Sequence, residues 1–473
     1  MDDFFFRKKG LCYLLKYSTN KILLFGQMNK KERFGKEPLA KLLREQAIPA
    51  SVGILVMSIY MIVDTIFVGR FVGSLGIAAI TVVMPITFFI SSIGMAIGIG
   101  GSSIISRAFG EKNDDKAYLT FGNQVFLIVV LTTLLLIVGF AFQKEILNAF
   151  GGKGEILEPA SNYFRILLYG VPFLAWAMMS NNVIRAEGYP GFAMYTLLIP
   201  AVVNIVLDPI MIVALDMGIE GAAWATSISY FISAGYTLWF FIKGKSQLKL
   251  NLNRIRPNFP IIKEIASIGS ITLARQGTIS VLSIVVNNAL FKYGGEISLS
   301  TYGIINRVMM FANFPVLGIT QGFVPILGYN YGAQLFKRVK ELIFLSIKTA
   351  TVIALGVFTL IMVFTPQIIS IFTEDSELIR KTIPALRGIF LATPLLAVNL
   401  LGSAYFQAIG KALPALMLTL SKQGFFLIPL ILILPLQFGL NGIWYSFPIA
   451  DVGAAVITFI FLRKEMHKTI GLN

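Results

Sequence analysis

The stretch SIYMIVDTIFVG, Ser58–Gly69, lies inside a long apolar run that begins near Ala47. One acid, Asp64, stands in its middle, with Tyr60 one helical turn earlier. A carboxylate at membrane depth costs roughly 2.5–3.5 kcal/mol on insertion scales, and no basic residue within the stretch neutralises it. Asp64 is therefore a candidate functional residue, although a hydrogen bond that only packs it against a neighbouring helix is the plainer alternative.

The composition extends this pattern to the whole chain. Of 473 residues, 56% are hydrophobic and 14% are charged, whereas a soluble domain carries about 25% charged residues. Apolar runs recur along the chain, which predicts an all-α polytopic membrane protein. The net charge of +16 comes from basic residues between these runs, so it suits the membrane surface and not a nucleic acid. A single cysteine and a single histidine exclude an internal disulfide framework, a multi-cysteine metal site and histidine proton relays within the membrane.

Run lengths and turn signals predict about twelve transmembrane helices. The expected spans are 47–70, 76–106, 117–142, 159–184, 191–215, 219–243, 261–291, 299–328, 338–365, 379–407, 412–435 and 439–462. The protein is expected in the cell (plasma) membrane. Loops on one side of the membrane carry most of the Lys and Arg, so both termini are expected in the cytoplasm. The basic segment before the first span is expected to be either an interfacial helix or a leader that starts at Met28.

The chain divides into two related halves. The stretch from Gly170 to Gly188 aligns with Ala392 to Gly410, and the shift stays near 222 residues elsewhere. Parallel repeats of this kind predict two pseudo-symmetric six-helix lobes around a central cavity. The expected domains are a cytoplasmic segment 1–46, an N-lobe 47–243, a linker 244–260, a C-lobe 261–463 and a cytoplasmic tail 464–473.

A second intramembrane acid, Asp208, follows Asn204 by four residues and precedes Pro209. Counted along their helices, Asp64, Asp208 and Thr226 all lie roughly 10 Å below the outer boundary, which allows them to meet. Two carboxylates in a poorly solvated site require either a proton on one of them or a cation between them. The sequence therefore predicts a coupling site for Na⁺ or H⁺ at Asp64, Asn204, Asp208 and Thr226. The plainer alternative for Asp208 is a cap after a proline kink.

Several motifs carry a resemblance that spans about residues 40–463. They are YMIVDTIFVG, GIGGSSIISRAFGEKNDDKA, NIVLDPI with GIEGAAWAT, and YGIINR with PILGYNYGA. With these motifs the chain resembles the multidrug and toxic compound extrusion (MATE) transporters. The resemblance implies an antiporter that exports amphipathic, often cationic compounds, with the cation site at Asp64, Asn204, Asp208 and Thr226. It also implies a substrate cavity at Tyr60, Asp64 and Asp208.

The second half departs from the pattern of one branch of this family. Arg275 and Arg307 stand in helices where that branch has acids, and Asn287 takes the repeat position of Asp64. An acidic ion site is therefore not expected in the C-lobe. Lys422 and Asp451 both fall near mid-membrane, and we expect them to pair because an unpaired charge there is costly.

Arg185 and Glu187 stand at a helix end and are expected to form a solvated cap. No catalytic set is visible, so an enzyme is the least favoured class. The expected function is multidrug efflux by a monomer without a cofactor, acting on organic cations in exchange for Na⁺ or H⁺. The main alternative is a flippase for lipid-linked oligosaccharides from a related superfamily, and a membrane receptor or channel is a more distant one.

Overall fold

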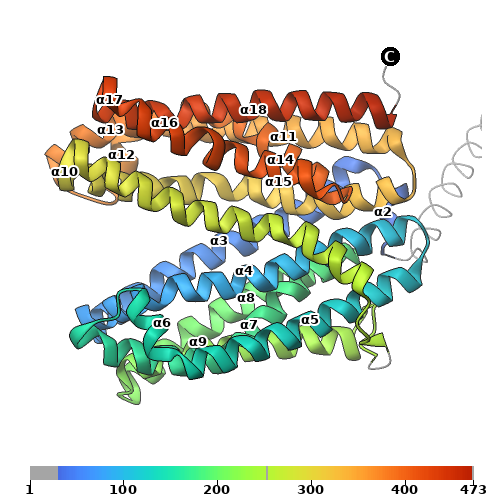
Figure 1. Cartoon of the computed structure of the whole chain (residues 1–473), viewed down its shortest axis with the longest axis horizontal. Coiled ribbons are helices and arrows are strands. Elements are labelled where there is room, and N and C mark those ends of the chain that lie inside the picture. The colour runs from blue at the N-terminus through green and yellow to red at the C-terminus, as the bar shows by residue number, and fades with distance from the viewer. Residues whose placement is uncertain (1–29, 252–253, 471–473) are drawn as a thin grey trace, which may run out of the picture.

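A computed structural model describes residues 30–251 and 254–470, and every regular element in these ranges is a helix (Figure 1). Eleven helical stretches there are long and apolar enough to cross a membrane. The longest, α10 (Phe259–Gly332), has a non-helical residue at Gly295, with φ 65°, and therefore supplies two spans. The prediction of about twelve spans is thus confirmed. The expectations for an interfacial helix or a start at Met28 fall outside the described residues.

The helices form two lobes that lie one above the other in Figure 1. The N-lobe contains α3 (Leu39–Phe71), α4 (Ser74–Gly110), α5 (Asp114–Ala141), α6 (Gln143–Ala149), η1 (Gly154–Ile156), α7 (Leu157–Ala186), α8 (Pro190–Asp208), η2 (Pro209–Ala214) and α9 (Gly218–Ile242). The C-lobe contains α10, α11 (Phe336–Val363), α12 (Thr365–Ser370), α13 (Ser376–Phe390), η4 (Thr393–Leu395), α14 (Leu396–Ala408), α15 (Ala412–Leu420), η5 (Ser421–Leu427), α16 (Ile428–Ile433), α17 (Pro435–Phe438) and α18 (Leu440–Ile470). The short α2 (Arg33–Lys36) precedes both lobes.

Two helix boundaries differ from the sequence prediction by eight residues, more than the others do. The first membrane helix begins at Leu39, not near Ala47, because Leu39, Leu42 and Leu43 are buried in the protein core. The last helix extends to Ile470, and its final part is held by an ion pair of 2.5 Å between Lys411 and Glu465. Hydropathy alone misses both extensions because their apolar residues contact protein and alternate with charges.

The backbone repeats between the lobes as the sequence does. Residues with positive φ recur at equivalent turns, 222 residues apart in three cases and 221 in the fourth. The pairs are Gly73 and Gly295, Lys112 and Gln334, Gly188 and Gly410, and Gly218 and Gly439. A left-handed conformation is uncommon outside glycine, so its recurrence at Lys112 and Gln334 marks the same loop built twice. The pseudo-symmetry of the two lobes is therefore visible in individual turns.

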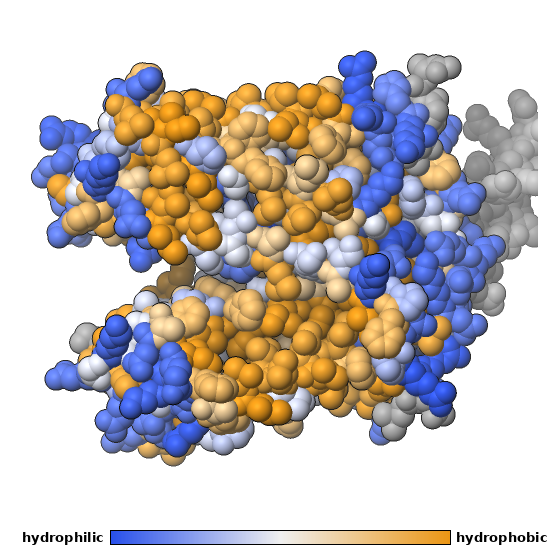
Figure 2. Space-filling model, in the orientation of Figure 1, coloured by the Kyte–Doolittle hydropathy of each residue, from blue (hydrophilic) through white to orange (hydrophobic). Residues whose placement is uncertain are grey.

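The lobes separate toward one end and meet at the other. Figure 2 shows a cleft that opens between them on the left, and Figure 1 places α2 and the C-terminal end of α18 at the opposite, closed end. The helices of the two lobes touch closely at the closed end, where a Cβ on Gly100 would clash with the carbonyl oxygen of Ile265. A Cβ on Gly332 would clash with the carbonyl oxygen of Arg107. Only glycine permits backbones to approach this closely.

Hydrogen bonds reinforce the closed end. Arg107 of α4 donates to the carbonyl oxygen of Ala408 at 3.0 Å and to Glu264 at 2.5 Å, both in the C-lobe. Arg338 donates to the carbonyl oxygens of Phe34 and Glu37, so the segment that contains α2 is fixed to the C-lobe. Any motion that opens this end must break these bonds.

The expectation of a solvated cap at Arg185 and Glu187 is wrong. Both side chains are buried, with 2% and 1% of their surface exposed. The linker folds back over this helix end, and Ser246 Oγ and the backbone N–H groups of Gln247 and Leu248 donate to the Glu187 carboxylate at 2.7, 3.0 and 3.3 Å. Burial raises the pKa of Glu187 to about 7. No pattern in the sequence predicts that the linker returns to this helix end.

Candidate functional site

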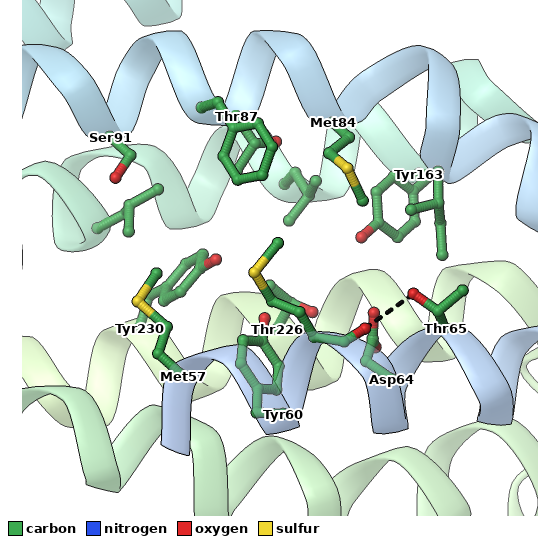
Figure 3. A pocket seen from close by; sticks show the side chains of 15 residues that line it. Met57, Tyr60, Asp64, Thr65, Met84, Thr87, Ser91, Tyr163, Thr226 and Tyr230 are labelled. Atoms are coloured by element: carbon green, nitrogen blue, oxygen red, sulfur yellow. Dashed lines mark hydrogen bonds between the residues drawn. The ribbon is translucent and has the colours of Figure 1, made fainter. Parts of the chain in front are cut away.

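The N-lobe contains a cavity of about 650 Å³ between α3, α4, α7 and α9 (Figure 3). Met57, Tyr60 and Asp64 line it from α3, while Met84, Thr87 and Ser91 face them from α4. The walls are largely apolar, aromatic and methionine-rich, a composition that suits binding of flexible or varied ligands. Asp64 is the one acid among the lining residues, and 9% of its surface is exposed.

Helix α3 presents Tyr60 and Asp64 on one face because the two residues are four positions apart. Thr65 also lines the cavity, but its hydroxyl donates to the carbonyl oxygen of Met61 at 2.8 Å within the same helix. The Asp64 carboxyl thus receives nothing from Thr65. Its Oδ1 atom is buried and has no hydrogen-bond partner among the described residues.

Helices α8 and α9 supply the remaining residues of the predicted site. The Asn204 amide donates to Asp208 Oδ1 and to Thr226 Oγ1, each at 3.2 Å. All three side chains are buried, with 1%, 0% and 5% of their surface exposed. Directly after Asp208, Pro209 begins the π-helical segment η2, a local widening that often occurs at functional sites.

The two acids lie near each other. Asp64 of α3 and Asp208 of α8 are close enough for their carboxyl groups to interact electrostatically. Two carboxylates this close in a buried site require either a proton on one of them or a cation between them. The structure therefore brings together Asp64, Asn204, Asp208 and Thr226, as their matched depths in the sequence allowed.

This cluster has more hydrogen-bond acceptors than donors. Asp64 Oδ1, Asn204 Oδ1 and Asp208 Oδ2 are all buried and lack a hydrogen-bond partner within the described part of the chain. Buried acceptors without partners are uncommon because they lose their interaction with water. Oxygen atoms of this kind are the ligands of protons and hard cations. In the described ranges, no group of three or more His, Cys, Asp or Glu side chains forms a transition-metal site.

One predicted cavity residue does not line the cavity. Asp208 is fully buried, whereas Tyr60 and Asp64 reach the surface of the cavity. Asp208 stands behind this surface because α8 is not among the helices whose residues line the cavity. A ligand in the cavity would contact Asp64 directly, whereas Asp208 would affect the ligand only through its interaction with Asp64.

Two tyrosines of the site were missed by the sequence analysis. Tyr163 and Tyr230 line the same cavity as Tyr60 and Thr226 (Figure 3). Tyr230 follows Thr226 by four residues on α9, so helical spacing could have identified it. Tyr163 lies near the start of α7 and carries no comparable signal in the sequence.

The C-lobe differs at the corresponding places. Lys422 and Asp451 form an ion pair with an Nζ–Oδ1 distance of 2.5 Å, which confirms the predicted pairing. Asn287, the repeat counterpart of Asp64, is exposed and does not enter a polar cluster. Arg307 is exposed and Arg275 is half-buried.

Comparisons with known proteins agree with this architecture. A model of the MatE family matches residues 49–210 and 273–433, one stretch in each lobe. The multidrug export protein MepA of Staphylococcus aureus (strain MSSA476) is 28% identical over 439 residues, covering 91% of this chain and 96% of that protein. The outward-facing conformation of a multidrug resistance MATE family transporter of the MOP superfamily has a TM-score of 0.89 at 26% identity, covering 94% of this chain and 100% of that chain.

A second similar structure is that of a MOP superfamily transporter from Pyrococcus furiosus Vc1 (DSM3638), for which reverse polarity of the binding pocket suggests a different function. It has a TM-score of 0.88 at 26% identity, covering 94% of this chain and 99% of that chain. The similarity thus extends over both lobes.

Proposed function

This chain belongs to the MatE family of transporters, and we propose that it exports amphipathic cations across the membrane in exchange for Na⁺ or H⁺. It is a multi-pass membrane protein and a multidrug efflux transporter, not an enzyme. The observation that carries the antiport proposal is the cluster beside the N-lobe cavity, in which two carboxyl groups are neighbours and three buried oxygens lack a partner among the described residues.

The substrate cation and the coupling ion both interact with the carboxyl groups of this cluster. A substrate cation in the cavity is attracted by Asp64, which lines the wall. A proton or Na⁺ at Asp64 and Asp208 removes that attraction, because it neutralises the acids or occupies their oxygens. The two ligands therefore favour different occupancies of the same carboxyl groups, which is the requirement for exchange.

Exchange also requires the lobes to alternate between two arrangements. Under the proposed orientation, with both termini in the cytoplasm, the cleft in Figure 2 opens outward. The substrate enters when the closed end has opened, and the coupling ion enters from the outside in the arrangement described here. To reverse a 99:1 population of the two arrangements, a ligand must discriminate between them by about 10⁴-fold.

The test is efflux of ethidium from proteoliposomes under an imposed gradient of Na⁺ alone or of H⁺ alone. Export driven by Na⁺ indicates a cation held by the oxygens of Asp64, Asn204, Asp208 and Thr226. Export driven by H⁺ indicates proton exchange on the two acids. Absence of export with both ions, from protein that is correctly folded, overturns the proposal and favours the flippase.

A further inference from the structure

The C-lobe contains a second cavity, of about 330 Å³, between the second half of α10, α13, η4, α14, η5 and α18. Its polar lining residues are Asn313, Thr393, Lys422 and Asp451, and the others are apolar or aromatic.

This cavity is the repeat of the N-lobe cavity. Six of its lining residues stand 221 or 222 positions after residues that line the N-lobe cavity, the same shifts that relate the turns of the two lobes. The pairs are Thr87 and Met309, Ser91 and Asn313, Leu167 and Ile389, Leu174 and Leu396, Thr226 and Phe447, and Tyr230 and Asp451. The fold thus forms the same cavity in both lobes, with different chemistry in each.

The chemistry of the C-lobe cavity is that of a donor-rich site. The Lys422 ammonium has three N–H groups, and Asp451 is its one recorded partner among the described residues. The side chains of Asn313 and Thr393 make no hydrogen bond to another described residue, so their N–H and O–H groups also remain available. The N-lobe site has the opposite excess, with three unpaired acceptor oxygens.

Lys422 is positioned to be reached by a ligand. It lies in the π-helical segment η5, and 24% of its side chain is exposed, against 9% for Asp451. The apolar walls of the same cavity include Phe390 and Phe447. An ammonium group beside aromatic side chains, with amide and hydroxyl donors around it, is complementary to a carboxylate on an aromatic body.

We infer that the C-lobe cavity binds the carboxylate group of an aromatic or amphipathic molecule through Lys422, with Asn313 and Thr393 as further donors. Asp451 holds Lys422 in place when the cavity is empty and competes with the ligand for the same ammonium group. This site goes beyond the proposed export of cations, because carboxylate binding can be measured without transport.

The competition between Asp451 and the ligand gives an unusual test. The probe is 1-naphthoate, with the uncharged 1-naphthamide as its control, and binding is measured on the purified full-length protein in detergent. We expect naphthoate to bind at least tenfold more tightly than naphthamide. Lys422→Gln should weaken naphthoate binding at least tenfold, whereas Asp451→Asn should strengthen it about tenfold because the internal competitor is gone.

A purely structural ion pair predicts something else. In that case both variants change naphthoate binding in the same direction or leave it unchanged, and either result overturns the inference. So does equal binding of naphthoate and naphthamide by the unmodified protein.

A third variant guards against misfolding. Asn313→Leu leaves the ion pair intact and removes one donor, so it should weaken naphthoate binding about fivefold without affecting naphthamide. No selective loss in this variant also counts against the site. Binding of tetraphenylphosphonium serves as the N-lobe readout: its absence contradicts the export proposal and leaves the carboxylate result standing on its own.

Discussion

The N-lobe and the C-lobe share one backbone arrangement but differ in the charges that line their cavities. In the N-lobe, Asp64 and Asp208 are neighbours with no ion pair to a described basic residue, and three acceptor oxygens are unpaired in the same part of the chain. In the C-lobe, Lys422 and Asp451 neutralise each other at 2.5 Å. An unbalanced site gains free energy when an ion arrives, whereas a balanced pair is already satisfied. The same fold therefore contains one site whose free energy depends on ion binding and one site that is stable when empty.

The largest effect should come from the acids of the N-lobe. Asp208→Asn or Asp64→Asn should reduce ion-driven ethidium efflux to the background of empty liposomes, because the coupling ion loses its charge partner. Thermal stability should not fall, since a buried acid without a countercharge is replaced by a neutral amide of the same shape. Asp216→Asn, at an exposed acid just beyond η2, is the matched control and should retain full efflux.

Normal efflux by both variants would remove these acids from the mechanism. A parallel loss of thermal stability would instead make them structural, and the contrast with the C-lobe would disappear.

The second prediction concerns the C-lobe pair, where the stability effect should be reversed. Asp451→Asn leaves the Lys422 ammonium without its partner, so we expect the free energy of unfolding to fall by about 2–4 kcal/mol. The double variant Lys422→Gln and Asp451→Asn removes both charges and should regain most of this loss. Thermal unfolding in detergent, followed by tryptophan fluorescence, provides the measurement. Equal stability of the single and the double variant would contradict the ion-pair argument.

Sequence alone predicted a large part of this contrast. The intramembrane position of Asp64 and Asp208, the i to i+4 spacing from Asn204 and the 222-residue repeat come from periodicity and depth. The sequence did not predict that the two acids lie side by side, because it gives their depth in the membrane but not their positions within the membrane plane. The burial of Glu187 was missed for a related reason, since the linker residues that cover it are 59 or more positions away. The matched C-lobe cavity needed the coordinates of both lobes.

A third prediction compares repeat positions at the closed end, Glu187 in the N-lobe and Ile409 in the C-lobe. Burial raises the pKa of Glu187 to about 7 from its ordinary value of 4.5. Ionisation is thus harder in the folded protein, so the contribution of Glu187 to stability is greatest below pH 4.5 and is lost as the pH rises from 4.5 to about 7. The full change is at most about 3 kcal/mol.

Glu187→Gln should flatten this part of the pH profile, whatever its effect on absolute stability. Thermal unfolding between pH 5 and pH 9 gives the profile, with Glu220→Gln at a half-buried acid as the control. An unchanged slope in Glu187→Gln would assign the pH dependence to other groups.

The smallest effect separates two threonines of the N-lobe cavity. Thr226 accepts a hydrogen bond from Asn204 at 3.2 Å, whereas the Thr65 hydroxyl donates to its own helix. One such hydrogen bond is worth about 1 kcal/mol, so Thr226→Val should raise the half-saturating concentration of the driving ion about fivefold. Thr65→Val should change it less than twofold, because a hydroxyl bonded to the preceding turn contributes little to helix stability and nothing to the ion. Both substitutions keep the side-chain volume, so a difference between them isolates the hydroxyl that faces the acids. Equal effects would mean that the cavity wall as a whole, and not the Asn204–Thr226 contact, orders the coupling site.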